Sequence, residues 1–195
     1  MKAEAARRDD WLLVDQDESW FSRFAQPAVQ AYAPTAAPMR LVERTPAPDE
    51  PDKAIACYGA VSQLTTERWL YLAEGQPNSD LTILCLQALL QVAQAKHKRV
   101  LVVIWDRASW HKSRAVKAWV RQHNQQVKRQ QTGVRLLTVL LPTKSPWLNP
   151  MEPIWYHTKR KVVEPDGELP VKVLKERLCA QFHTTLDAAT LKTSG

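Results

Sequence analysis

The chain has few cysteines, and their spacing excludes two kinds of site. Cys57, Cys85 and Cys179 are far apart and odd in number, and no Cys-x-x-Cys pair occurs. Neither a cysteine-based zinc site nor a disulfide framework is therefore indicated. We expect a protein of the reducing cytoplasm.

Long hydrophobic runs are also missing. The N-terminal residues are mostly polar and lack the apolar core of a signal peptide. No apolar run approaches the ~20 residues that span a bilayer. We therefore expect a soluble protein with no membrane contact, and a flexible N-terminal end at residues 1–10.

Apolar residues and positive charge are well represented. Hydrophobic residues make up 45% and charged residues 24% of the 195-residue chain, a balance typical of a soluble globular domain. The formal net charge of +7 favours a polyanionic partner such as nucleic acid, although charge alone leaves that question open.

The hydrophobic pattern predicts strands first, and then strands and helices in alternation. Predicted strands cover residues 11–14, 28–33, 54–61, 68–72, 100–105 and 134–141, of which 54–61 and 68–72 form a hairpin. Predicted helices cover residues 80–96, 112–126, a stretch beginning at Asn149, and 171–182. A proline-rich stretch, 34–53, is expected to be an exposed loop. This order indicates an α/β fold with a central mixed β-sheet flanked by α-helices.

Carboxylates lie at the ends of two predicted strands. Asp106 directly follows the apolar run 100–105, and three acids follow the run 11–14. Since side chains alternate along a strand, Asp15 and Asp17 share one face and Glu18 lies on the other. If the two strands are parallel neighbours, the carboxylates of Asp17 and Asp106 meet at one edge of the sheet.

A third carboxylate, that of Glu152, lies in the first turn of a predicted helix. Asn149 is a good N-cap for this helix, and Pro150 suits its first position. Three neighbouring acids repel each other, so their convergence indicates a bound cation. Oxygen ligands alone favour Mg²⁺ or Mn²⁺, and two such ions are suited to attack on a phosphodiester.

Each carboxylate also has a purely structural interpretation. The acids after residue 14 could form a solvated turn, and Asp106 could bond backbone amides at its strand end. Glu152 could complete a capping box by bonding the backbone N–H of Asn149. The positions of all three together favour the metal site.

Basic side chains are candidates for phosphate contacts, or form a solvated face. They lie off the apolar stripe of the helix 112–126 and near the end of the helix that begins at Asn149. His111 could touch substrate or metal, or be structural, and we include it among the candidates for DNA binding. The full set is His111, Lys112, Arg114, Lys117, Arg121, Lys159, Arg160 and Lys161.

Two motifs resemble a known family. Val102-Val-Ile-Trp-Asp-Arg-Ala-Ser-Trp-His-Lys-Ser113 and Ser145-Pro-Trp-Leu-Asn-Pro-Met-Glu-Pro-Ile-Trp155 are similar to the catalytic core of bacterial insertion-sequence transposases related to the mariner elements. This is the "six-thirty" group of the DDE superfamily. The family's first motif, a strand ending in Asp-Glu, matches Asp17-Glu18 and selects Asp17 over Asp15. Arg107 stands where the family usually has asparagine.

The resemblance implies an RNase H-like catalytic domain over residues 11–163, followed by a C-terminal helical extension, 164–195. Asp17, Asp106 and Glu152 would be the catalytic residues and the ligands of two Mg²⁺ (or Mn²⁺) ions. The implied activity is cutting and joining of DNA strands, with transposon ends and target DNA as partners.

Such transposases normally begin with a helix-turn-helix region, which this sequence lacks. We therefore expect the catalytic part of a truncated or split transposase, with a homodimer and a separate helix-turn-helix chain as candidate partners. The alternatives are an inactive DNA-binding or scaffold remnant of a transposase, or another RNase H-like nuclease.

Overall fold

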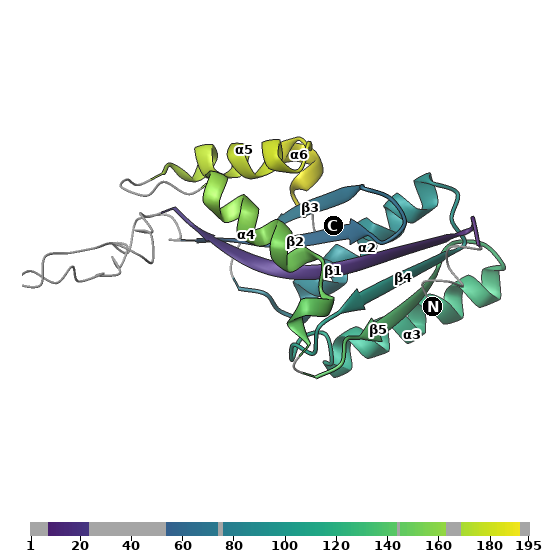
Figure 1. Cartoon of the computed structure of the whole chain (residues 1–195). Coiled ribbons are helices and arrows are strands. Elements are labelled where there is room, and N and C mark those ends of the chain that lie inside the picture. The colour runs from purple at the N-terminus through teal and green to yellow at the C-terminus, as the bar shows by residue number, and fades with distance from the viewer. Residues whose placement is uncertain (1–7, 24–53, 74–75, 144, 163–168, 192–195) are drawn as a thin grey trace, which may run out of the picture.

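The computed structural model describes residues 8–23, 54–73, 76–143, 145–162 and 169–191 (Figure 1). The strands are β1 (Trp11–Ser22), β2 (Ala54–Ser62), β3 (Arg68–Ala73), β4 (Val100–Trp105) and β5 (Arg135–Leu140). The helices are α2 (Ser79–Ala95), α3 (Arg114–Gln130), α4 (Met151–Val162), α5 (Val171–Gln181) and α6 (Leu186–Ala189), with a 3-10 turn, η1, at Pro146–Leu148. None of the helices in these ranges is long and apolar enough to cross a membrane.

The strands form one mixed sheet in the order β3-β2-β1-β4-β5. β2 and β3 pair antiparallel, which confirms the predicted hairpin. β1 pairs antiparallel with β2 on one side and parallel with β4 on the other, and β4 pairs parallel with β5. The predicted α/β class with a central mixed sheet is confirmed.

The first strand is much longer than predicted. The sequence indicated a strand that begins with the apolar run 11–14 and ends among the acids that follow it, whereas β1 continues to Ser22 and has the acids within it. β2 stabilises this polar half, because it pairs with β1 from Val14 to Ser22 and satisfies the backbone groups there. β4 pairs with β1 only as far as Asp15. Residues 16–22 of β1 therefore pair with β2 but not with β4.

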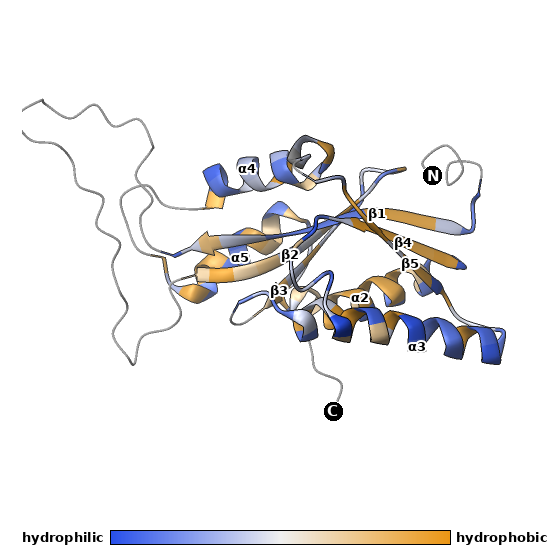
Figure 2. Ribbon diagram, turned by 90° about the horizontal axis from the view of Figure 1, so that it is seen from below, coloured by the Kyte–Doolittle hydropathy of each residue, from blue (hydrophilic) through white to orange (hydrophobic). Residues whose placement is uncertain are grey.

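Helices cover both faces of this sheet. In Figure 2, α2 and α3 lie on one side of the strands and α4 on the other. α2 begins after Asn78, whose side chain accepts a hydrogen bond from the Leu81 N–H at 2.9 Å. Its buried residues lie on the side that faces the sheet; they are Thr82, Cys85, Leu86, Leu89, Leu90 and Ala93.

α3 begins later and ends later than its apolar stripe predicted. Ser113 caps it through a 3.2 Å hydrogen bond from the Val116 N–H, and the helix runs on to Gln130 through polar sequence. The Asn124 amide explains this extension, because it donates to the Leu136 carbonyl at 2.8 Å and accepts from the Leu136 N–H at 2.9 Å. These bonds hold the polar half of α3 against β5.

On the opposite face, α4 approaches the sheet closely over Gly59. A Cβ at this position would lie 2.4 Å from Met151 Cε and 2.4 Å from Trp155 Cζ2, so only glycine leaves room for the helix. α5 packs beside α4 in the same hydrophobic cluster, through Leu174 and Leu178. The C-terminal helices thus share a core with the sheet, while the division at residue 163 stays a prediction.

Some predicted features lie outside the described residues. These are the strand 28–33, the loop 34–53 and most of the N-terminal end, 1–10. Where the chain first enters the described region, the Asp10 carbonyl accepts hydrogen bonds from the N–H groups of Arg99 and Val100, at 2.7 and 3.2 Å.

Candidate active site

The parallel pairing of β1 with β4 places two of the three acids beside one another. Asp15 is the register partner of Ile104, so two residues further along each strand Asp17 follows on β1 and Asp106 follows β4. Both side chains then belong to the same face of the sheet, since side chains alternate with a period of two. The prediction that these two strands are adjacent and parallel is confirmed.

α4 brings the third acid to the same face. The indole N–H of Trp155 donates a 3.1 Å hydrogen bond to Oδ2 of Asp17, which ties the helix to β1. Glu152 lies one turn earlier on this helix and is exposed. Figure 1 shows β4 and β5 running towards the segment where α4 begins.

The beginning of α4 is fixed by Asn149, which is buried. Its side-chain oxygen accepts a hydrogen bond from the Met151 N–H at 3.0 Å, and its carbonyl accepts from the Glu152 N–H at 3.2 Å. In the described part of the chain, the Glu152 carboxylate takes no hydrogen bond from the Asn149 N–H. The capping-box interpretation therefore finds no support, and the carboxylate remains available to a ligand.

The pKa of Asp17 is strongly raised by its surroundings. Burial, followed by the negative charges of Glu18, Glu152 and Asp106, raises the pKa of Asp17 to about 7. A group in this state gains a great deal from a nearby cation, which would compensate for both burial and repulsion. The negative charges of Asp106 and Glu152 thus both act on Asp17.

Asp106 is held in place by a buried histidine. His111 lies between two carboxylates, with Nδ1 at 2.8 Å from Asp106 Oδ1 and Nε2 at 3.0 Å from Glu18 Oε1. Its ring stacks on Trp105 at a centroid distance of 4.4 Å. The Ala108 N–H donates a further hydrogen bond to Asp106 at 2.8 Å. Half of the Asp106 side chain, 51%, remains exposed on the other side.

The two carboxylates keep His111 protonated. Burial alone would lower its pKa, but the hydrogen bonds to Asp106 and Glu18 and their negative charges outweigh burial and raise the pKa of His111 to about 9. Conversely, the hydrogen bond from His111 holds the pKa of Asp106 below its usual range. Both ring nitrogens are therefore donors.

His111 is also a predicted DNA-binding residue. Only 3% of it is exposed and both ring nitrogens are engaged by carboxylates, so a structural role is the one that these contacts support, and contact with DNA stays a prediction. Its structural partner is Glu18, which also accepts hydrogen bonds from Gln16 at 3.0 Å and Trp110 at 3.3 Å. The sequence could not identify this partner, because it lies 93 positions away.

Two other residues of the site, Gly59 and Trp155, were not assigned roles from the sequence. A single glycine within an apolar strand indicates close approach of another element, which is the signal for Gly59. Trp155 was part of a recognised motif, but its hydrogen bond to Asp17 depends on how α4 crosses the sheet.

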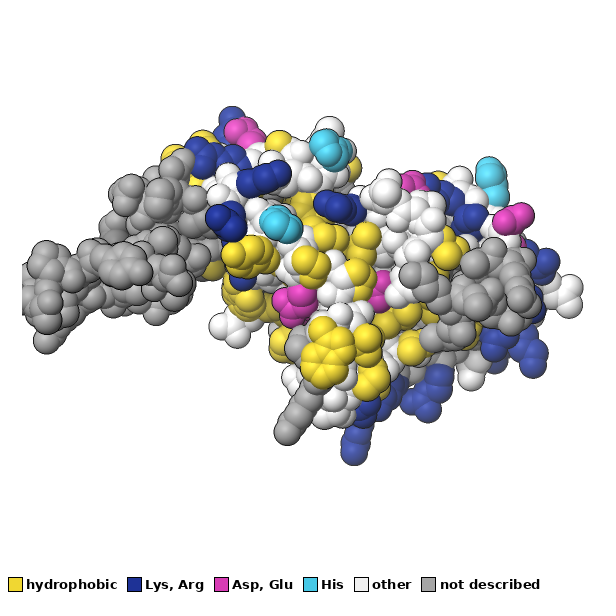
Figure 3. All heavy atoms as spheres, viewed as in Figure 1, with side chains coloured by type: hydrophobic (Ala, Val, Ile, Leu, Met, Phe, Trp, Pro, Cys, Tyr) yellow, Lys and Arg dark blue, Asp and Glu magenta, His cyan; other side chains and the backbone are white. Residues whose placement is uncertain are grey.

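The remaining basic candidates are exposed and form two groups. One lies on α3 or just before it: Lys112, Arg114, Lys117 and Arg121. The other lies in the last turns of α4: Lys159, Arg160 and Lys161. In Figure 3, basic side chains gather over α4 and acidic ones lie near its beginning. Contact of either group with DNA stays a prediction.

The carboxylates of Asp17, Asp106 and Glu152 are not close enough together to surround a metal ion. Within the described ranges no group of three His, Cys, Asp or Glu side chains is close enough to hold an ion. Asp17 and Asp106 each use an oxygen on a protein donor, Trp155 and His111 respectively. The donors are nonetheless of a kind that fits a hard divalent cation, since all three are carboxylates and one of them, that of Asp17, has a strongly raised pKa.

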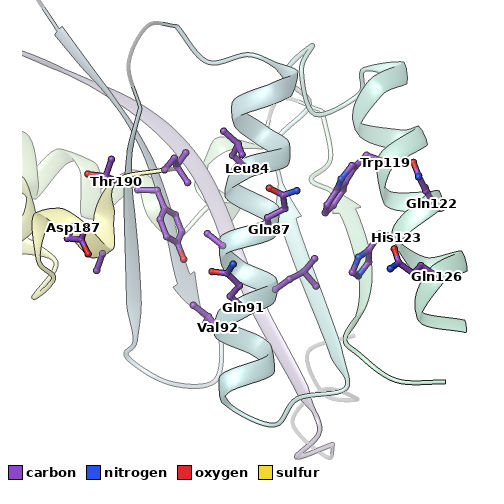
Figure 4. A pocket seen from close by; sticks show the side chains of 15 residues that line it. Leu84, Gln87, Gln91, Val92, Trp119, Gln122, His123, Gln126, Asp187 and Thr190 are labelled. Atoms are coloured by element: carbon purple, nitrogen blue, oxygen red, sulfur yellow. The ribbon is translucent and has the colours of Figure 1, made fainter. Parts of the chain in front are cut away.

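A groove of about 880 Å³ lies away from these acids, between α2 and α3 (Figure 4). Gln87 and Gln91 of α2 face Trp119 and His123 of α3 across it. Its lining contains amides, apolar groups and one acid, Asp187, and none of the carboxylates of Asp17, Asp106 and Glu152. We therefore place the chemistry on the α4 face.

Solved structures of a DNA transposase have a similar fold. The Mos1 transposase paired-end complex with the left transposon end matches with a TM-score of 0.61 and 16% identity, covering 96% of this chain and 54% of that one. The Mos1 mariner paired-end complex with Mn matches with a TM-score of 0.60 and 16% identity, over 96% and 53% of the two chains. The corresponding complex with Mg gives 0.57 and 17%, over 93% and 51%.

The chain thus spans about half the length of the Mos1 chains, and the similarity confirms the RNase H-like fold. No curated protein matches the sequence. The family model described as "DDE superfamily endonuclease" matches residues 13–166, which is most of the chain. The protein therefore belongs to the DDE superfamily endonucleases.

Proposed function

We propose that this chain is the catalytic part of a transposase, and that Asp17, Asp106 and Glu152 hold two divalent metal ions for cutting and joining DNA strands. One observation carries the proposal. α4 is tied to Asp17 through Trp155, one turn after Glu152, on the face where Asp106 adjoins Asp17. A helix cap alone would not require this link to a partly buried acid.

Asp17 is the acid that we assign to both ions. Asp17 and Asp106 would hold one ion, and Asp17 and Glu152 the other, since the charges of both partners act on Asp17. Mg²⁺ or Mn²⁺ fits this set, which contains only oxygen ligands. The Mos1 complexes with Mn and Mg support the same choice.

Bound in this way, the ions would activate a water or 3′-hydroxyl and stabilise the leaving oxygen. The protein's own residues position the ligands. His111 fixes one oxygen of Asp106, and the Trp155 indole fixes one oxygen of Asp17. No side chain is needed as a covalent nucleophile.

We further propose a bacterial origin within the "six-thirty" group, on the basis of the motifs around Asp106 and Glu152. The partner would be DNA at transposon ends and target sites, as in the Mos1 complex with its left transposon end. Recognition of those ends would come from another chain or a missing segment, with a homodimer as the working form, and the protein would act in the cytoplasm.

Glu152→Gln tests the proposal, because glutamine keeps the shape of the side chain and removes its charge. Mg²⁺-dependent nicking of a supercoiled plasmid should fall at least a hundredfold, an order-of-magnitude expectation for an ion that stabilises charge in the transition state. Glu176→Gln, on the exposed surface of α5, is the matched control and should nick like the wild type. Full activity in Glu152→Gln would contradict the proposal. Inactivity of the wild type with every divalent ion and end-recognition partner would favour the inactive remnant.

A further inference from the structure

Exposed aromatic and apolar side chains gather in the sequence around Glu152. Of the six large hydrophobic side chains that are exposed in the described ranges, three lie within five residues of this acid: Trp147, Leu148 and Tyr156. Trp147 is 76% exposed and Tyr156 is 59% exposed. In Figure 3, hydrophobic side chains border an acidic one near the beginning of α4. Exposed apolar side chains that cluster in this way mark interaction sites, whereas scattered ones do not.

Tyr156 lies on the same side of α4 as Glu152. Side chains four residues apart on a helix are neighbours, with Cβ atoms about 5–6 Å apart. Glu152, Tyr156 and Arg160 follow one another at this interval and are all exposed. They run beside the buried stripe of the helix, which consists of Met151, Trp155, Thr158 and Val162. The Tyr156 ring therefore projects one turn after the carboxylate that we assign to a metal ion.

Contacts within α4 orient the Tyr156 ring. Arg160 donates a 3.3 Å hydrogen bond to the Tyr156 hydroxyl, and its guanidinium lies 5.6 Å from the ring centroid. The His157 ring lies edge-on to the Tyr156 ring, also at a centroid distance of 5.6 Å. The ring is thus held by its own helix while most of its surface faces solvent.

A nucleobase suits such a ring when basic side chains lie beside it. Stacking on an aromatic side chain is indifferent to sequence, because every base has a π-face. Lys159 and Arg160 are exposed, and they follow Glu152 at spacings of seven and eight residues, which places them on the same side of α4. They can contact the phosphates that accompany a base. An apolar protein surface would match the rings but not these two charges.

We propose that Tyr156 and Trp147 stack on nucleobases that have left the duplex beside the phosphate to be cut. Bases inside a duplex are covered by their neighbours, so an exposed ring can stack only on an unpaired or terminal base. The inference rests on the proposed function for the role of Glu152. It deepens that function by naming the state of the DNA at the site, which is unpaired next to the cleavage position.

The test measures the preference of the metal-free protein for unpaired DNA. Two duplexes of the same sequence are compared in chelator, one blunt and one with a 3′ overhang of about three nucleotides, a length that offers a base to each ring. Affinity is measured by the anisotropy of a dye at the opposite end. The overhang contains 2-aminopurine, whose fluorescence is quenched when it stacks on an aromatic ring. The wild type should quench it and bind the overhang duplex more tightly, by about 5- to 150-fold for each stacked base.

Tyr156→Leu and Trp147→Leu each keep an apolar side chain and remove a ring. Each should lose at least about fivefold of the preference, together with part of the quenching, whereas Tyr156→Phe should keep both. Trp20→Leu is the matched control and should behave as the wild type. Trp20 is 41% exposed on β1, and its side chain belongs to the opposite face of the sheet from that of Asp17.

Several results would overturn the proposal. These are a wild type without the preference, leucine variants that keep it, or an equal loss in Trp20→Leu. If the leucine variants keep the preference and instead change from dimer to monomer in size-exclusion chromatography, the rings cover a protein interface and the proposal is wrong.

Plasmid nicking by Glu152→Gln separates this proposal from the catalytic one. If Glu152→Gln nicks like the wild type while Tyr156→Leu loses its preference for unpaired DNA, the assignment of Glu152 fails and the stacking role of Tyr156 stands. If Glu152→Gln is inactive while the wild type binds both duplexes equally, only the stacking proposal fails.

Discussion

Replacing Asp17 by asparagine should stabilise the metal-free protein, by an amount that grows with pH. Asp17 is the acid on which burial and three neighbouring carboxylates act together, and its pKa is about 7 instead of 3.8. Asparagine has nearly the same shape, can still accept the hydrogen bond from Trp155, and carries no charge. The substitution therefore removes the repulsion and leaves the packing in place.

The sign follows from the direction of the pKa change. The folded state binds the Asp17 proton more tightly than the unfolded state, so the wild type loses stability as the pH rises from about 4 to about 7. The difference between a pKa of 3.8 and one of about 7 corresponds to about 4 kcal/mol of unfolding free energy. Because solvent reaches part of the side chain and screens the charges, we expect about 2–4 kcal/mol.

Urea denaturation of both proteins in chelator, from pH 4 to pH 8, measures this difference. The two unfolding free energies should agree near pH 4, diverge up to pH 7 and then stay about 2–4 kcal/mol apart. Mg²⁺ should close the gap by stabilising only the wild type, by about 2.7 kcal/mol at a hundred times its Kd. A variant that is no more stable than the wild type at pH 8 would show that Asp17 is not under repulsion.

Two further substitutions test the supports of the site. His111→Gln removes a buried cation between Glu18 and Asp106, so it should cost about 3 kcal/mol in chemical denaturation at pH 6. Because the pKa of His111 is raised from 6.5 to about 9, the advantage of the wild type should shrink as the pH rises from about 6.5 to 9, and a loss that does not depend on pH would contradict the charged bridge. Gly59→Ala places a methyl group 2.4 Å from Trp155, so the urea midpoint should fall by the equivalent of about 1–3 kcal/mol. Ser79→Ala, at the partly exposed start of α2, is its control, and an unchanged midpoint in Gly59→Ala would show that α4 does not pack tightly on β2.

The apolar runs were sufficient to predict most strands and their arrangement. The run 100–105 is buried on both faces in β4, and the hairpin of β2 and β3 lies where two apolar runs separated by a polar turn indicated it. The run 11–14 predicted only the first third of β1, because residues 15–19 are polar and gain strand structure through their pairing with β2. Local pattern contains no information about such a partner.

The sequence was sufficient to predict that Asp17 and Asp106 are neighbours, but not to predict which side chains hold them in place. Asp17 and Asp106 follow apolar runs, and parallel pairing then makes them neighbours. The partner of His111 is an acid on a distant strand, and the place of Trp155 depends on the absence of a side chain at Gly59. Both are tertiary contacts between residues that no sequence spacing connects.

The most direct test of the central claim is the number of Mn²⁺ ions that the protein binds, counted by electron paramagnetic resonance. The wild type should bind two ions per chain in the assigned site. Asp17→Asn should lose both, because Asp17 is the ligand assigned to each, whereas Asp106→Asn and Glu152→Gln should each lose one. Binding of two ions by Asp17→Asn with wild-type affinity would contradict the account.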